Sequence, residues 1–233
     1  MDWTTASLGI DPVRYEEVLT YLFDRPVPNG QQQEWYWGDE LVPFEASPLE
    51  WTRFQTAIFA NAATDLIGFD NEQVGMGLNY LTNNGLSDVP FAAVDPSVSL
   101  DEAMRMMHAM PTLWCDCIGK RLQDASPINS PISSGAGGRL WHACYMWFDV
   151  WPTFRLASAS QPWRDACWNL FVEMLGVPCR AVQIAALHGV GHSVDLLDRD
   201  VDVARVISTF VRSLNDDHTL RVYAEAARQG NVQ

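Results

Sequence analysis

The residues whose type and spacing come nearest to a reactive site are two histidines, four positions apart. His188 and His192 close the segment CRAVQIAALHGVGH, which begins at Cys179. On a helix, residues at i and i+4 share one face, and zinc enzymes with an H-E-x-x-H helix hold their ion by this spacing. The pair therefore defines a candidate metal site, and a metal-dependent or histidine-dependent hydrolase is one alternative function.

The sequence departs from that motif in two respects. Gly189 stands where the motif has its glutamate base, and a third ligand would have to come from Asp195 or Asp198, beyond the helix end. Without a chemical role, Gly189 and Gly191 would allow close helix contact or end the helix, and the histidines would bond neighbouring carbonyls or carboxylates. On this interpretation we expect no cofactor and no stoichiometric metal.

The cysteines offer a second set of metal-ligand types. Cys115 and Cys117 are two residues apart, as are His142 and Cys144, in segments predicted to be helical. Side chains two apart on a helix point about 200° away from each other, so neither pair converges on one ion. The five cysteines, an odd number, are predicted to be buried thiols and not a disulfide framework.

Acidic and aromatic residues form the remaining candidate surface. The irregular segment 26–44 carries a cluster of aromatic and acidic side chains, and more carboxylates follow the histidine helix. Such residues suit an interface with an arginine- or lysine-rich protein, although charge runs are usually solvated faces. The binding candidates are Trp35, Tyr36, Trp37, Asp39, Glu40, Asp195, Asp198, Asp200 and Asp202.

Helices are the elements that must position these residues. Capping patterns precede apolar residues at helical spacing at Ser47, Asp70 and Ser99, and Pro111 must bend or divide the third of these helices. The nearly unbroken apolar run after Cys179 predicts a central helix surrounded by others. Either Asp198 or Asp200 is expected to cap the helix that follows, and no segment predicts a strand.

The sequence predicts one all-helical domain over residues 1–233. Its fold class is all-α, with antiparallel helical hairpins arranged as a HEAT-like α-solenoid or a compact helical array. Residues 125–138, with two prolines and three glycines, are predicted to form a mobile surface loop. The short reversal Gly176-Val177-Pro178 predicts a tight αα-hairpin.

The segment AALHGVGH, preceded by Cys179 and followed by the helix expected from Asp198 to Leu214, resembles the ALHGxGH segment of uncharacterised bacterial HEAT-like proteins. The resemblance covers about 60 residues, and two successive predicted hairpins of roughly 35 to 40 residues each resemble the period of HEAT-type helical repeats. It implies an α-solenoid or a solenoid-like bundle of stacked hairpins. It implies no activity.

Composition narrows the range of partners. The chain has 15 basic and 29 acidic residues, for a net charge of −14, which repels nucleic-acid phosphates and anionic membranes. No apolar run approaches the ~20 residues of a membrane span, and the start MDWTTASLGIDP has no signal-peptide pattern. We therefore expect a cytoplasmic protein with a basic protein as partner; the sequence does not predict its oligomeric state.

The leading functional hypothesis is a non-enzymatic protein-interaction module, in the manner of an immunity or antitoxin-like inhibitor of a basic protein. The acidic and aromatic surface would supply the contact. Two alternatives stay open: the hydrolase that uses His188 and His192, and a small-molecule-binding helical domain whose pocket tryptophans line. Ten tryptophans spread along the chain also serve as core filling between helices.

Overall fold

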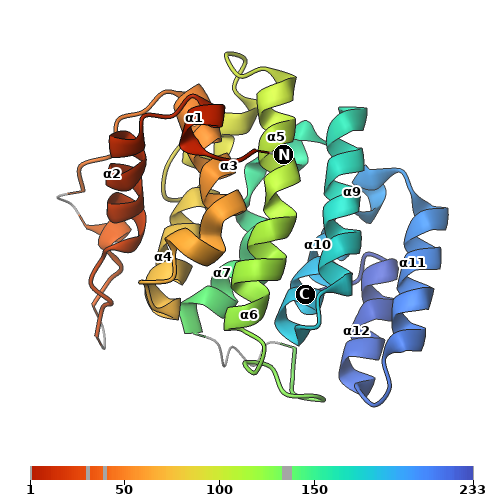
Figure 1. The fold of residues 1–233 in the computed structure, drawn as a ribbon. Coiled ribbons are helices and arrows are strands. Elements are labelled where there is room, and N and C mark those ends of the chain that lie inside the picture. Colours follow the sequence, from red (N-terminus) through yellow and green to blue (C-terminus); the bar gives the residue numbers. More distant parts are fainter. Residues whose placement is uncertain (1, 30–31, 39–40, 133–137, 233) are drawn as a thin grey trace.

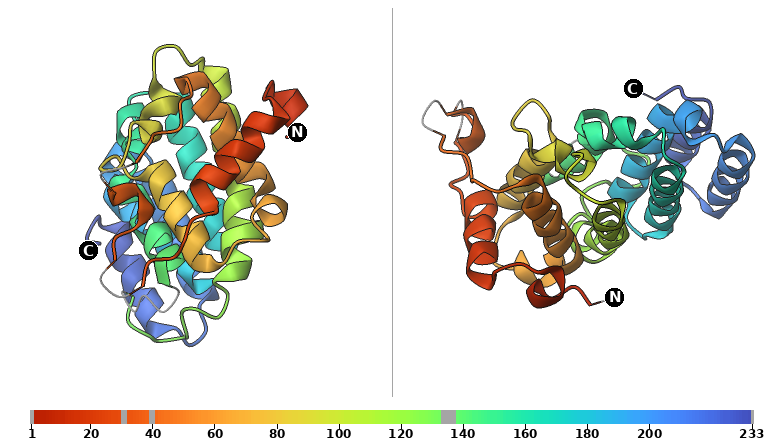
Figure 2. Two further views of the ribbon diagram at one scale, coloured as in Figure 1. Left: turned by 90° about the vertical axis from the view of Figure 1, so that its left-hand side faces the viewer. Right: turned by 90° about the horizontal axis from the view of Figure 1, so that it is seen from above.

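The chain folds into helices packed side by side, and the computed structural model describes residues 2–29, 32–38, 41–132 and 138–232. Within these ranges there is no β-strand, which confirms the all-α prediction. The helices form a row from α2 at one end to α11 at the other (Figures 1 and 2). The elements are α1 (Thr5–Leu8), α2 (Pro12–Phe23), η1 (Trp35–Trp37), α3 (Pro48–Asp65), α4 (Asn71–Thr82), η2 (Val89–Val94), α5 (Leu100–Thr112), η3 (Leu113–Ile118), α6 (Gly119–Arg121), α7 (Gly138–Val150), α8 (Pro152–Ala157), α9 (Gln161–Gly176), α10 (Arg180–Leu197), α11 (Asp200–Ser213) and α12 (His218–Arg228).

Side-chain caps begin the N-terminal helices, as the sequence predicts. Ser47 and Glu50 satisfy each other's backbone N–H groups at the start of α3, and Asp70 does the same with Gln73 at the start of α4. At α5, Ser99 accepts from the backbone of Glu102, but the Glu102 carboxylate accepts from Arg53 at 2.7 and 3.0 Å. At α5, therefore, only the serine half of the capping box forms, and the Glu102 carboxylate instead links α5 to α3 through Arg53.

The long helix that contains Pro111 changes its winding after the proline. Pro111 is the last residue but one of α5. The six residues that follow α5, 113–118, form the π-helical segment η3, which leads into α6. Proline removes one backbone donor and clashes with the preceding turn, so a change in the hydrogen-bond ladder here is expected. The sequence predicts that Pro111 bends or divides the helix; the structure shows a change of winding directly after α5, with helical residues continuous over 100–121.

Helix α10 occupies the centre of the C-terminal half. It packs against α7, α9, α11 and α12, and between Arg180 and Gly191 every residue except Gln183 is buried. Gln183 donates to the carbonyl oxygens of Val177 and Leu175, which fastens α10 to the reversal after α9. The predicted central helix and its tight hairpin with α9 are confirmed, whereas the HEAT-like repeat stays a prediction.

The end of α10 differs from the prediction. The glycines do not end the helix, which continues to Leu197, and Asp198 then takes the left-handed conformation with φ of 53°. Helix α11 follows after Arg199, and no side chain caps it. The expectation that Asp198 or Asp200 caps α11 is therefore wrong, because Asp198 serves to terminate α10 and Asp200 is already helical.

Part of the predicted loop 125–138 is anchored. Asn129, with φ of 61°, accepts from the backbone N–H of His218 and donates to the carbonyl of Asp216. Ser130 accepts from the buried side chain of Arg180. Residues 125–132 are thus tied to the turn between α11 and α12; residues 133–137 lie outside the described residues, and Gly138, the last residue of the predicted loop, begins α7.

None of the described helices combines the length and the apolar composition that a membrane span requires.

Candidate metal centre

Two helices distant in sequence bring the histidine pair together with a carboxylate. Helix α7 carries Trp141, Tyr145 and Asp149 at successive i+4 positions, so these side chains share one face. That face meets the face of α10 that carries His188 and His192. A metal-ligating group thus forms between α7 and α10.

The ligand atoms of the group are close together. Nε2 of His188 lies 2.9 Å from Oδ2 of Asp149, and Nε2 of His192 lies 2.9 Å from Oδ1 of the same carboxylate. The two Nε2 atoms are 3.2 Å apart. We call Asp149, His188 and His192 the His–Asp triad. In the described part of the chain it is the one group of three or more metal-ligating side chains whose atoms lie within 4.8 Å of one another.

His188 also contacts two tyrosines. Its Nδ1 lies 2.6 Å from the hydroxyl of Tyr223 on α12, and its ring packs on Tyr145 with 4.3 Å between ring centroids. Tyr145 stacks in turn on Trp141, at 5.0 Å. Burial raises the pKa of Tyr223, and its hydrogen bond with Tyr145 raises it further, so Tyr223 keeps its proton at neutral pH.

The charge states of the other two members of the triad follow from their surroundings. Burial alone would raise the pKa of Asp149, but the hydrogen bond from His188 and the charges of His188, His192 and Arg155 together lower it. Burial lowers the pKa of His192, and His188 and Arg155 lower it further against the opposing effect of Asp149. At neutral pH, Asp149 is therefore ionised and His192 is neutral.

Two glycines let neighbouring elements approach this part of α10. A Cβ at Gly189 would lie 2.5 Å from the ring of Phe171 and 2.7 Å from that of Phe148. A Cβ at Gly191 would lie 2.5 Å from the side chain of Val232. All three distances are below normal van der Waals contact, so Gly189 permits close helix contact, as expected, and Gly191 admits the chain segment at Val232.

The third member of the triad is not the predicted one. The sequence pointed to Asp195 or Asp198, yet both side chains are exposed and neither belongs to the triad. Asp195 lies inside α10 and Asp198 follows its last residue, Leu197, so neither side chain folds back toward His188. Asp149 takes that place because α7 packs alongside α10.

The cysteine pairs do not converge, as predicted. His142 is exposed whereas Cys144 is buried, and Cys115 and Cys117 also differ in exposure. All five cysteines are free thiols, and burial raises the pKa of Cys144 and Cys167. Protonated buried thiols are poor metal ligands.

The aromatic candidates divide between core and surface. Tyr36 is buried and its hydroxyl accepts from Asn79, and Trp35 is partly buried beneath the guanidinium of Arg25, which lies 4.7 Å from its ring centroid. Trp37 is 50% exposed and is the member of this cluster that a partner can reach. The other two members, Asp39 and Glu40, lie outside the described residues.

The carboxylates at the end of α10 and the start of α11 are mostly at the surface. Asp195, Asp198 and Asp200 are exposed. Asp202 is partly buried and forms ion pairs with Arg205 at 2.7 Å and with Arg199 at 3.6 Å. The negative charge of Asp202 is thus compensated within the chain, which leaves the other three as the accessible part of the cluster.

Sequence reasoning missed Asp149, Tyr145 and Tyr223. Asp149 had a detectable signal, because it is the one carboxylate in the otherwise apolar segment LWHACYMWFDV, and a partly buried carboxylate requires a partner. The two tyrosines had no such signal, since they contact His188 only through packing of helices far apart in the chain.

Comparison of the chain with protein-family models, with curated proteins and with solved structures finds no match.

Proposed function

We propose that this protein binds a divalent transition-metal ion through Asp149, His188 and His192 and uses the ion for hydrolysis. The observation that carries the proposal is the convergence of two Nε2 atoms, 3.2 Å apart, on one carboxylate 2.9 Å from each. Ligands of one tetrahedral zinc ion, at about 2.0–2.1 Å from it, are separated by roughly 3.3 Å. Small rotations of these side chains would therefore accommodate an ion, and the donor set suits zinc or iron.

The hydrogen bonds of His188 support this role. A metal ion would require the His188 tautomer in which Nδ1 carries the proton and donates to Tyr223; Nε2 then gives up its hydrogen bond to Asp149 and has a lone pair for the ion. Three electron-pair donors then face one another, an arrangement that a cation stabilises. A hydrogen bond at the far nitrogen of a ligating histidine is the usual way in which proteins orient such a ligand.

An open coordination position is what would make the site catalytic. Structural zinc sites have four protein ligands, whereas catalytic sites have three and a water. The triad offers three, and the His192 and Asp149 side chains are 30% and 21% exposed while His188 is 2% exposed. Solvent therefore reaches the ligand atoms from the His192 side, where a bound ion would have its open position and would supply the acidified water that ester or phosphoester hydrolysis requires.

Metal titration tests the site. We expect metal-stripped protein to take up about one equivalent of zinc in calorimetry, and His192→Ala or Asp149→Asn to lower the affinity at least tenfold. His142→Ala is the matched control, since this exposed histidine lies on α7 outside the triad. Unchanged zinc affinity in both triad variants, at retained helicity, would contradict the proposal.

A second measurement separates binding from catalysis. The zinc- and iron-loaded proteins are assayed with p-nitrophenyl acetate and p-nitrophenyl phosphate, and hydrolysis is expected to disappear in Asp149→Asn and to persist in His142→Ala. If the protein binds stoichiometric metal but hydrolyses neither substrate, the metal site is supported and the hydrolytic part of the proposal is contradicted.

A protein-interaction role is the second candidate, and the charge of the chain favours it. The net charge of −14 and the exposed carboxylates of Asp195, Asp198 and Asp200 suit a basic protein partner, as does exposed Trp37. Long-range attraction would steer such an association, so its on-rate should fall as salt screens charges beyond about 8 Å. A pull-down at low and moderate salt tests this role: recovery of a basic protein that salt releases supports it, and recovery of none counts against it.

A further inference from the structure

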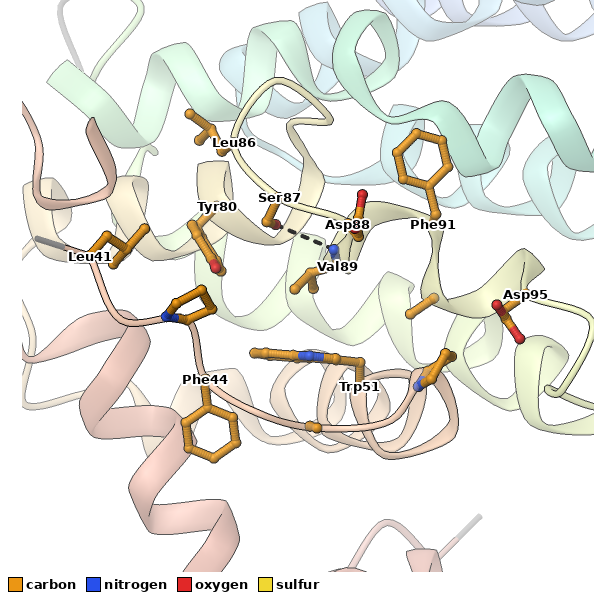
Figure 3. Close-up of a pocket in the computed structure, with 14 residues that line it drawn as sticks. Leu41, Phe44, Trp51, Tyr80, Leu86, Ser87, Asp88, Val89, Phe91 and Asp95 are labelled. Atoms are coloured by element: carbon orange, nitrogen blue, oxygen red, sulfur yellow. Dashed lines mark hydrogen bonds between the residues drawn. The ribbon is translucent and has the colours of Figure 1, made fainter. Parts of the chain in front are cut away.

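A cavity of about 580 Å³ lies among α3, α4, η2 and the segment that leads into α3, away from the His–Asp triad. Its aromatic lining residues are Phe44, Trp51, Tyr80 and Phe91. Figure 3 shows the Trp51 ring along one side of the cavity, opposite Asp88 and Val89, with Leu41 and Tyr80 toward one end and Asp95 toward the other. The volume is in the range of pockets that hold small organic molecules.

The charge of the lining has one sign. Asp88 and Asp95 contribute carboxylates, and none of the described residues that line the cavity is a lysine, arginine or histidine. The field of the whole chain, with its net charge of −14, acts in the same direction. The lining therefore complements a cation and repels an anion.

The two carboxylates differ in the hydrogen bonds that they make within the chain. Asp95 accepts from both the backbone N–H and the hydroxyl of Ser97, at 2.8 and 2.5 Å, and so holds its own turn. Asp88 is exposed and precedes η2 without making a side-chain capping bond. Asp88 is thus the carboxylate that has no evident structural task within the described residues.

The surrounding aromatic cluster already holds cations against its rings. The guanidinium of Arg14 lies 4.6 Å from the centroid of Phe44, and that of Arg25 lies 4.8 Å from Tyr21 and 4.7 Å from Trp35. These rings contact Trp51 and Tyr80 in turn. Trp51 is 6% exposed and lines the cavity with the part of its surface that its neighbours leave open; in the described part of the chain no cation covers its indole, the strongest cation-binding ring type.

From the cavity, its aromatic lining and its uncompensated carboxylate, we propose that it binds a small organic amine in its cationic form. The apolar body of the amine would pack on Trp51 and Val89, and its ammonium group would lie between the Trp51 ring and Asp88. This site is independent of the metal centre, because no residue of the triad lines it.

Calorimetry with three probes of similar size tests charge selectivity: 2-phenylethylammonium, neutral 3-phenylpropan-1-ol and anionic 3-phenylpropionate, with chelator present to keep the triad free of metal. The cation is expected to bind at least tenfold more tightly than either of the others. Equal affinity for the alcohol or the anion, or no binding of the cation, would overturn the proposal.

Variants locate the binding. Asp88→Asn should lower the affinity for 2-phenylethylammonium about tenfold, and Asp200→Asn, an exposed carboxylate on α11, should leave it unchanged. In NMR spectra the cation should shift the indole N–H signal of Trp51, which is identified by its absence in Trp51→Phe. An affinity that Asp88→Asn does not change, or an unmoved Trp51 signal, would overturn the assignment to this cavity.

Discussion

The hydroxyl of Tyr223 lies 2.6 Å from Nδ1 of His188, although 35 residues separate them in the chain. This contact joins α12 to α10 and holds the histidine ring in the orientation that directs Nε2 toward Asp149. The same hydrogen bond therefore belongs to the packing of the C-terminal helices and to the geometry of the triad.

The variant Tyr223→Phe tests the contribution of this hydrogen bond to stability and to zinc binding. Loss of the hydroxyl leaves Nδ1 of buried His188 without its partner, so we expect a loss of about 1–3 kcal/mol in the free energy of unfolding. Zinc affinity should fall about 10–100-fold, as for other partners of ligating histidines. Denaturant titration and calorimetry measure the two effects. Tyr21→Phe, which removes a hydroxyl paired with Tyr80 at 3.2 Å, is the control and should leave zinc affinity unchanged.

Gly189→Ala should destabilise the protein by about 1–3 kcal/mol, because its Cβ would overlap the rings of Phe171 and Phe148 in a packed core. Gly176→Ala is the matched control at the end of α9, where an added Cβ meets no atom within 4 Å. There the higher helix propensity of alanine should raise stability, by up to about 1 kcal/mol. Thermal and denaturant unfolding compare the pair, and equal effects would contradict the close packing at Gly189.

The buried ion pair between Arg180 and Asp217 should make stability fall in acid. Burial alone would raise the pKa of Asp217, but hydrogen bonds from Arg180 and from the backbone of Leu220 outweigh it, and the pKa is lowered on folding. A carboxyl group with a lowered folded-state pKa stabilises fully above its unfolded value of about 3.9, and this contribution is lost as pH falls through the folded-state pKa.

The variant Asp217→Asn tests this pH dependence. It leaves the Arg180 charge buried without a counter-charge, so we expect a loss of about 3–5 kcal/mol at neutral pH. It should also flatten the decline in the free energy of unfolding below pH 4. Denaturant titrations from pH 7 to pH 3 measure both effects, and a variant that declines as steeply as the original protein would contradict the lowered pKa.

Single substitutions distinguish the two tryptophans of η1. Trp37→Ala should change stability by less than about 0.5 kcal/mol, since the ring is half exposed. Trp35→Ala should cost about 2–4 kcal/mol, because this ring packs against Tyr21, Tyr80 and the guanidinium of Arg25. Thermal unfolding of the two variants measures the difference. Equal losses would show that the two rings are not divided between core and surface.

Local sequence patterns account for the elements whose causes lie within a few residues. Reciprocal caps at Ser47 and Asp70, the proline at position 111 and the apolar run of α10 predict helices, because helical hydrogen bonds join residues four apart and the caps act within three. The shared face of His188 and His192 follows from the same short-range geometry.

The side chains that face those histidines are set by the packing of helices far apart in the chain. Asp149 lies 39 residues from His188 and Tyr223 lies 35 away on the other side, and each reaches it because α7 and α12 both pack on α10. Helix periodicity identifies the buried face of each helix but not the helix that covers it, since apolar packing is non-directional. For the same reason Asp195 and Asp198, nearer in sequence, point to solvent, and the third member of the triad comes from a helix that the histidine motif does not mention.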